Sequence, residues 1–338
     1  PDYAVTGVQT CALPISGTNM SLTMNYAIGD LSKVSYTSVQ QVTKAIAKGS
    51  LMGARGNSGV ILSQIFRGFA KACEGHDYID VLVLAAAFKE AANTAYKAVL
   101  KPVEGTILTV IREMGDRANQ LVEAPITLDR FFQGIIQQGE KSLKNTPNLL
   151  PALKQAGVID AGGKGLLLII EGFYDALLGK EMEVLAHQPQ ETTQSLEIAQ
   201  AVMNTEDILF TYCTEFIVRG DNLVGADLKE RIESMGDSMV YVPDEDLIKV
   251  HIHTNDPGLV MQEALKFGEL IKIKIENMKE QHVNILDMAA HNQSVSSSPS
   301  ADDALMPEMK SKVPKPYGFV AIAAGEGLAD VFRDLGVD

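Results

Sequence analysis

The sequence predicts a multidomain protein with an all-α domain, then an α+β domain, then the beginning of a third domain. Two observations indicate this order. Apolar residues recur with a period near 3.6 over residues 31–178, whereas the period becomes two beyond residue 206. With 46% hydrophobic residues in a chain of 338, there is enough apolar material for more than one core.

Polar stretches without periodicity separate these patterns and are typical of linkers. The predicted division is 1–16 as a probable non-native segment, 17–182 as the helical domain, 183–205 as a linker, 206–285 as the α+β domain, 286–316 as a second linker, and 317–338 as the start of a truncated third domain.

The helical domain rests on successive amphipathic segments. One of them begins after a glycine-rich stretch, with Ser58 at the position expected of an N-cap, and its apolar residues keep a helical period through Cys73. Further helices are predicted over 79–100, 104–118, 127–144 and 162–178. Proline-containing breaks separate them, because proline interrupts a helix.

The second domain rests on alternating strands and short helices. Strands are predicted over 208–218, 238–242, 246–254 and 269–276, and helices over 225–235 and 257–267. The order β-α-β-β-α-β is that of the split-βαβ, or ferredoxin-like, arrangement.

Composition excludes several classes of function. The net charge of −14 argues against nucleic-acid binding, which needs a basic surface. No run of about 18 apolar residues predicts a membrane span, and the N-terminal residues lack the pattern of a secretory signal. Three well-separated cysteines, Cys11, Cys73 and Cys213, are too few for a disulfide framework. We therefore expect a cytoplasmic protein that is not integral to a membrane.

Three motifs combine glycine with hydroxyl or amide side chains at predicted helix starts: Ser16–Met20, Gly53–Gly59 and Asp160–Gly165. Free amides at a helix N-terminus favour an anion such as phosphate, and glycine lets the anion approach the backbone. Taken singly, each motif is equally well an ordinary helix cap. The spacing matches neither the P-loop nor the dinucleotide-binding fingerprint, so a nucleotide here would be bound by another fold.

Alternation along the predicted strands places Lys249, His251 and His253 on one open, polar face of the sheet. The first and third strands are neighbours in a split-βαβ sheet, so Cys213 can meet both histidines there. One thiolate and two imidazoles are good zinc ligands and leave a fourth position for water or substrate. The alternative is a solvated face that carries two histidines and an uninvolved cysteine.

Several of these motifs resemble those of a known family. The three helix starts, together with Pro102–Val110, are similar to the nucleotide-binding domain of the dihydroxyacetone kinase L-subunit (DhaL-like) superfamily, and most similar to its bacterial fatty acid kinase A branch. The segments Tyr212–Phe216, Val250–Gly258 and Lys274–Met278 resemble the middle domain of that branch, and residues 317–338 resemble the opening of its C-terminal domain.

The resemblance implies a barrel of helices that binds ATP and magnesium ions at one end. It also implies phosphorylation of a fatty acid carboxylate to an acyl phosphate, with the lipid presented by a separate acyl-binding protein. The family's ATP contacts map to Thr18, Asn19, Asn57, Ser58, Gly59, Thr106, Asp160 and Gly162. Its middle domain also has a metal site, which supports zinc at Cys213, His251 and His253; His253, beside the Thr254–Asp256 turn, is the candidate catalytic residue.

The chain departs from this family just before Gly17, where the family has an aspartate-rich turn that holds magnesium. Residues 11–16 read Cys-Ala-Leu-Pro-Ile-Ser and contain no acid. Residues 5–15 resemble a translated sequencing-adapter oligonucleotide, which is why residues 1–16 are predicted to be non-native. The magnesium ligands are therefore expected to be absent, and this chain is expected to be a poor kinase or none.

Other functions remain open on the sequence alone. They are a dihydroxyacetone (glycerone) kinase-like phosphotransferase, a non-catalytic scaffold that binds nucleotide and metal, and a metallohydrolase in which zinc activates water with Glu215 as the candidate base. Acyl chain preference, the identity of the partner and the oligomeric state, a homodimer included, are also left open.

Overall fold

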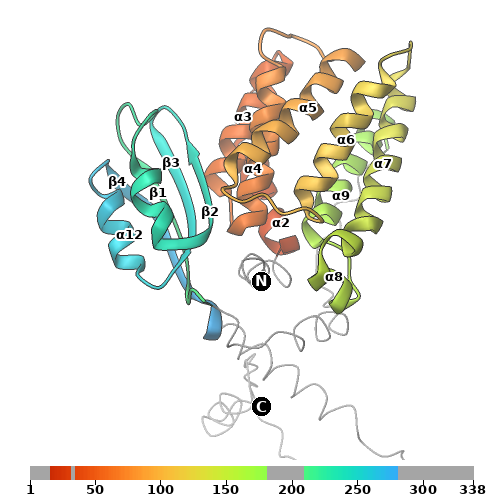
Figure 1. Ribbon diagram of the computed structural model, residues 1–338. Helices are drawn as coiled ribbons and strands as arrows, with labels where there is room; N and C mark the ends of the chain where they lie inside the picture. The colour runs from red at the N-terminus through yellow and green to blue at the C-terminus, as the bar shows by residue number, and fades with distance from the viewer. Residues whose placement is uncertain (1–15, 32–34, 181–208, 281–338) are drawn as a thin grey trace, which may run out of the picture. The chain divides into compact units, whose positions relative to one another are not determined.

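The computed structural model describes residues 16–31, 35–180 and 209–280, all within one compact unit of the chain, residues 1–293 (Figure 1). The segment before residue 16, most of both predicted linkers and the predicted third domain at 317–338 lie outside the described residues. None of the helices within the described ranges is both long and apolar enough to cross a bilayer.

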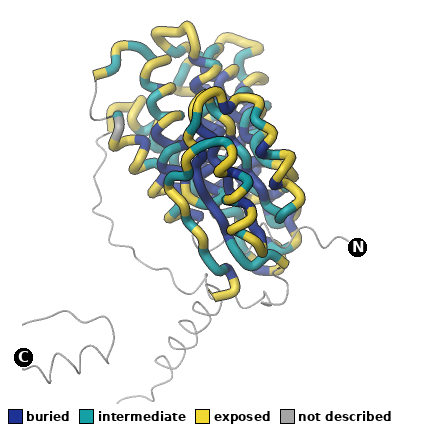
Figure 2. The backbone as a smooth tube through the Cα atoms, turned by 90° about the vertical axis from the view of Figure 1, so that its left-hand side faces the viewer, coloured by how far each residue is buried: buried dark blue, intermediate teal, exposed yellow. Residues whose placement is uncertain are grey.

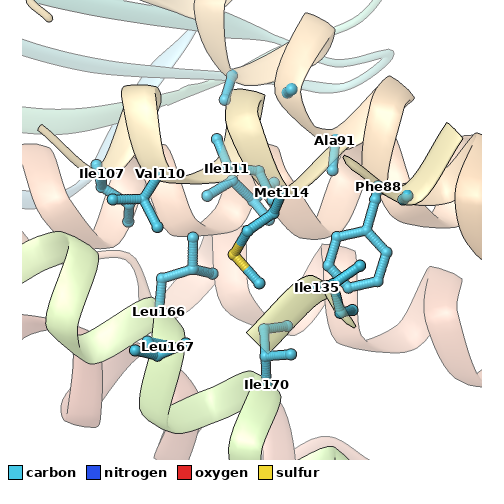
Figure 3. Packing of buried hydrophobic residues seen from close by; sticks show 14 of the residues in the cluster. Phe88, Ala91, Ile107, Val110, Ile111, Met114, Ile135, Leu166, Leu167 and Ile170 are labelled. Atoms are coloured by element: carbon cyan, nitrogen blue, oxygen red, sulfur yellow. The ribbon is translucent and has the colours of Figure 1, made fainter. Parts of the chain in front are cut away.

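The first domain is helical, as predicted. Its helices are α2 (Ser16–Leu31), α3 (Val39–Gly53), α4 (Gly56–Ala72), α5 (Val81–Ala98), α6 (Ile107–Leu121), α7 (Leu128–Leu149), α8 (Pro151–Ala156) and α9 (Ala161–Leu177). Their apolar faces meet in one core, where Met114 lies among Ile111, Ile135 and Leu166 (Figure 3). Cys73 is fully buried at the end of α4, as expected of a core residue.

One predicted helix start is wrong. Helix α4 begins at Gly56 rather than after Ser58, and Arg55 occupies the N-cap with an extended backbone and no side-chain cap. Gly56 has φ +56°, a left-handed conformation that glycine adopts without steric cost. The chain therefore enters the helix earlier than the apolar pattern indicates, which leaves the Ser58 side chain free to contact another helix.

The second domain is a four-stranded antiparallel sheet with two short helices. Its elements are β1 (Tyr212–Arg219), α11 (Leu228–Ile232), a 3-10 turn (Glu233–Met235), β2 (Gly236–Pro243), β3 (Leu247–Thr254), α12 (Pro257–Ala264) and β4 (Glu269–Asn277). The strand order is β2-β3-β1-β4, so β1 and β3 are neighbours as the sequence predicts.

Strand β3 is buried on both of its faces. Ile248, Val250 and Ile252 pack in the core beneath α11 and α12. The other face carries Lys249, His251 and His253, which are only 0–3% exposed. Figure 2 shows buried residues along the strands and exposed residues on the outer helices.

The prediction of an open polar face is therefore wrong. The turn between α3 and α4 covers this face: Leu51, Ala54 and Val60 form an apolar cluster with Val240 and Val242 of β2. Val99, just after α5, pairs with Val240 as an isolated β-bridge. Alternation along a strand shows which residues share a face, but it cannot show that a distant helical segment packs on that face.

Candidate functional site

The starts of α2 and α4 lie against each other. The Ser58 hydroxyl donates to the Ser16 hydroxyl over 3.0 Å, and both side chains are buried. The backbone N–H of Arg55 donates to the Thr23 hydroxyl over 3.3 Å. A Cβ atom on Gly59 would lie only 2.4 Å from that hydroxyl oxygen, so glycine permits this close approach of the two helices.

Two of the predicted phosphate contacts fall at this junction. The Asn19 amide nitrogen lies 2.5 Å from the position that a Cβ atom would take on Gly56. The Asn57 amide oxygen is buried and has no hydrogen-bond partner among the described residues. A buried acceptor of this kind suits a ligand that brings a donor or a cation. Thr18 is exposed one turn away.

The starts of α6 and α9 form a second junction. Asp160 is the N-cap of α9, and its carboxylate accepts the Gly163 N–H over 2.6 Å and a hydrogen bond from the backbone of Ile107. Burial raises the pKa of the Asp160 carboxyl to about 6 although both amide bonds favour the charged form. Thr106 is the N-cap of α6, and Gly162 packs against Ile107.

Helix α9 also contacts α2, because a Cβ atom on Gly165 would lie 2.7 Å from the Met20 sulfur. The structure therefore brings all three glycine-containing motifs to one end of the helical domain, which is the convergence that the phosphate hypothesis requires. It does not itself show a nucleotide there.

The second cluster lies between β1 and β3. Cys213 pairs with His253 in the register of the two strands, and Glu215 pairs with His251. One ligand atom from each of Cys213, His251 and His253 lies within 4.8 Å of the others, and all three residues are buried. The two Nε2 atoms are 3.3 Å apart, and the Cys213 sulfur is 4.0 Å from the His251 ring nitrogens.

Carboxylates stand behind both histidines. His251 Nδ1 is 2.9 Å from Glu215 Oε1, and His253 Nδ1 is 3.5 Å from Asp237 Oδ1. Carboxylates in this position fix the ring orientation of metal-binding histidines. With both Nδ1 atoms directed to acids, the Nε2 atoms face a common point beside the Cys213 sulfur. The donor set and its surroundings therefore fit zinc.

Glu215 has a further partner in the helical domain. Its Oε1 accepts the backbone N–H of Gly56, the first residue of α4, over 2.7 Å. Burial by itself raises the pKa of this carboxyl, but the hydrogen bond with His251 and the charges of Lys249 and Lys274 lower it overall to about 2. Glu215 is thus held as a carboxylate between the metal-like cluster and the start of α4.

Two lysines contact the other end of the same turn. Lys249 Nζ donates to the carbonyl of Ala54 over 3.1 Å, and Lys272 Nζ donates to that of Met52 over 2.7 Å. Burial lowers the pKa of the Lys249 ammonium. Sequence reasoning missed Asp237 and both lysine contacts. Strand alternation does place Lys249 beside the histidines, but its partner lies 195 positions away in the chain.

Comparison with known proteins identifies the class. Residues 16–175 match the DAK2 domain, and residues 209–285 match the FakA-like middle domain of fatty acid kinases. The chain therefore belongs to the DhaL-like family. Its combination of the two domains places it with the fatty acid kinase A subunits of that family.

Relatives of this chain occur in Bacillus and Staphylococcus. Protein YloV of Bacillus subtilis (strain 168) is 43% identical over 329 residues, covering 95% of this chain and 57% of YloV. Uncharacterized proteins of Staphylococcus saprophyticus (SSP1546) and Staphylococcus aureus strain USA300 (SAUSA300_1119) are 41% and 40% identical with the same coverage. The chain thus spans about 57% of the length of these curated relatives.

Proposed function

We propose that this chain is the nucleotide-binding part of an ATP-dependent kinase subunit that phosphorylates a fatty acid carboxylate to an acyl phosphate, in the cytoplasm, on a lipid presented by a separate acyl-binding protein. The observation that carries the proposal is the convergence of three glycine-containing helix starts at one end of the helical domain, beside a buried Cys/His/His cluster. Membership of the DhaL-like family supplies the reaction class.

The helix starts would hold the nucleotide through its phosphates. Backbone amides at the start of α4 point to a site that also contains Asn19 and the Asn57 amide oxygen. In phosphoryl transfer the protein acts by positioning the phosphates and neutralising their charge, so a rigid set of amides suits this role. Thr106, Asp160 and Gly162 then form the neighbouring wall of the nucleotide site.

The second domain would hold zinc through Cys213, His251 and His253. Bound zinc would supply a Lewis acid beside the phosphate site. Glu215 and Asp237 orient the two histidines, and we assign His253 as the residue that acts in the chemistry. The strand order β2-β3-β1-β4 and the two crossing helices support a ferredoxin-like classification of this domain.

Magnesium does not fit the residues present. The chain has no carboxylate between Asp2 and Asp30, and the only acid in the three motifs, Asp160, is already bonded to two backbone amides. Magnesium takes oxygen ligands, commonly carboxylates, so the charge of the phosphates would go largely unneutralised. This observation favours, as the second candidate, a non-catalytic form that binds nucleotide and metal.

The test compares this chain with a variant whose residues 11–16 are replaced by an Asp-Gly-Asp-containing turn, and with a matched Asn-Gly-Asn turn as control. Acyl phosphate formed from ATP and a lipid-loaded carrier is trapped with hydroxylamine. We expect the aspartate turn alone to raise the rate by about 10³-fold. Full activity in the unchanged chain would show that the placement of magnesium is wrong. A restored variant that neither binds ATP nor forms product would rule out the kinase.

A further inference from the structure

A single oxygen atom of Glu215 contacts both candidate sites. Oε1 accepts the Gly56 N–H at the start of α4 over 2.7 Å, and it lies 2.9 Å from Nδ1 of His251. Glu215 is 3% exposed, so water does not replace either partner readily. The Gly56 amide belongs to the turn assigned to phosphate, and His251 belongs to the cluster assigned to zinc.

The surrounding contacts hold this turn against the sheet domain by matched charge. The carboxylate of Glu215 meets the start of α4, where the helix dipole is positive. Lys249 and Lys272 donate to carbonyls at the end of α3, where the dipole is negative. Lys272 also lies 4.0 Å from the centre of the Tyr26 ring on α2. The α3–α4 turn is therefore fixed from both sides by residues of the sheet domain.

We infer that Glu215 is a positioning residue that couples metal binding at Cys213, His251 and His253 to anion binding at the start of α4. The inference rests on the two proposed sites and adds the linkage between them. A metal on Nε2 of His251 fixes the Nδ1–H toward Glu215, and the oriented carboxylate then holds the Gly56 amide. The cation also offsets the negative charge of Glu215, which otherwise repels a phosphate at the same turn.

The coupling has a definite sign. Zinc tightens the binding of MgATP, and by thermodynamic reciprocity MgATP tightens the binding of zinc by the same factor. Couplings of this type are commonly about 5-fold to 150-fold in affinity. Removing the charge of Glu215 breaks the linkage even where each site still binds its own ligand.

The test measures backbone hydrogen exchange at Gly56 in the full chain, with and without saturating zinc. Three proteins are compared: the wild type, Glu215→Gln, and Glu230→Gln as a control on the exposed side of α11. We expect zinc to slow exchange at Gly56 by about 5-fold or more in the wild type and the control. Glu215→Gln should bind zinc about 10-fold to 100-fold more weakly and lose the zinc-dependent difference. A purely structural role would lower the melting temperature without changing that difference.

A second measurement separates the inference from the proposed function. MgATP is titrated into zinc-loaded and zinc-free wild type, where we expect about 5-fold tighter binding with zinc. If zinc protects Gly56 but MgATP binds neither form, the coupling stands and the nucleotide site is wrong. If zinc binds and exchange at Gly56 does not change, the coupling is wrong. If the wild type binds no zinc, both the metal site and the coupling are refuted.

Discussion

The starts of α9 and α4 are both rich in glycine, yet their backbone amides find partners in different ways. At α9 the N-cap residue Asp160 accepts the Gly163 N–H three residues later. At α4 the N-cap residue Arg55 makes no side-chain cap, and the Gly56 N–H is donated to Glu215, 159 positions away. One helix start is completed locally, and the other is completed by a different domain.

This difference separates a structural start from a responsive one. A local cap forms whenever the helix forms, so the amides at α9 are already partly satisfied. The amides at α4 depend on how the sheet domain is placed and on the state of the cluster behind Glu215. The start of α4 can therefore respond to a ligand in a way that the start of α9 cannot. Four substitutions test this comparison.

The largest effect is expected on the metal cluster, which belongs to the α4 side of the comparison. Cys213→Ala removes one of three converging ligands and should weaken zinc binding by about 10³-fold or more. Asp160→Asn, at the α9 start, should leave zinc affinity unchanged. Competition with a chelating indicator measures both. Equal, negligible zinc in the wild type and Cys213→Ala would mean that the site does not exist.

The next effect is a pH dependence that belongs to α9. The pKa of Asp160 rises from 3.8 to about 6 on folding because the carboxyl is buried. The folded state then binds the proton more tightly, so stability falls as pH rises from about 4 to about 6. The shift corresponds to about 3 kcal/mol in the free energy of unfolding.

Urea denaturation between pH 4 and pH 7 measures this effect against Asp160→Asn, which does not titrate. The stability of the wild type relative to the variant should decline across that range. A difference that is flat with pH would show that Asp160 keeps an ordinary pKa and that water reaches its carboxyl in solution.

A smaller effect is expected where α4 packs on α2. Gly59→Ala places a Cβ atom 2.4 Å from the Thr23 hydroxyl, so the helices must separate, at a cost of about 1–3 kcal/mol of stability. Gly172→Ala, in α9, meets nothing within 4 Å and should stabilise by up to about 1 kcal/mol. Thermal denaturation distinguishes the two. Equal effects of both substitutions would contradict the close approach of α2 and α4.

The smallest effect comes from making the start of α4 resemble that of α9. Arg55 has the extended backbone of an N-cap, so Arg55→Ser adds a local acceptor and should stabilise by about 0.5–1 kcal/mol. Asp80→Ala, which removes the local cap of α5, should destabilise by about 1 kcal/mol. Chemical denaturation measures both. A destabilised Arg55→Ser would show that the amides of α4 do not accept a local cap.

Much of the fold could be predicted because its signals are local. The change of hydrophobic period located the boundary between a helical and a β-containing domain, and the order of strands and helices beyond residue 206 matches the structure. Alternation along two strands brought Cys213, His251 and His253 to one face, and the register of β1 with β3 agrees. Each of these inferences needs only neighbouring residues and the period of the backbone.

The same signals failed where a partner is distant in the chain. Ser58 has the chemistry of an N-cap, but its hydroxyl contacts Ser16 on another helix. Lys249 and the histidines alternate like a solvated face, yet the α3–α4 turn buries them. Periodicity separates one face of a strand from the other but does not show what covers either face.

The sequence by itself determined which side chains carry the chemistry: the three glycine-containing motifs, the Cys/His/His set and the lack of acids before Gly17. Only the tertiary structure decided that these groups meet, through Glu215, at the junction of two domains. The physical reason is that propensity and alternation act over a few residues. A hydrogen bond between Gly56 and Glu215 depends instead on how two separately folded surfaces pack together.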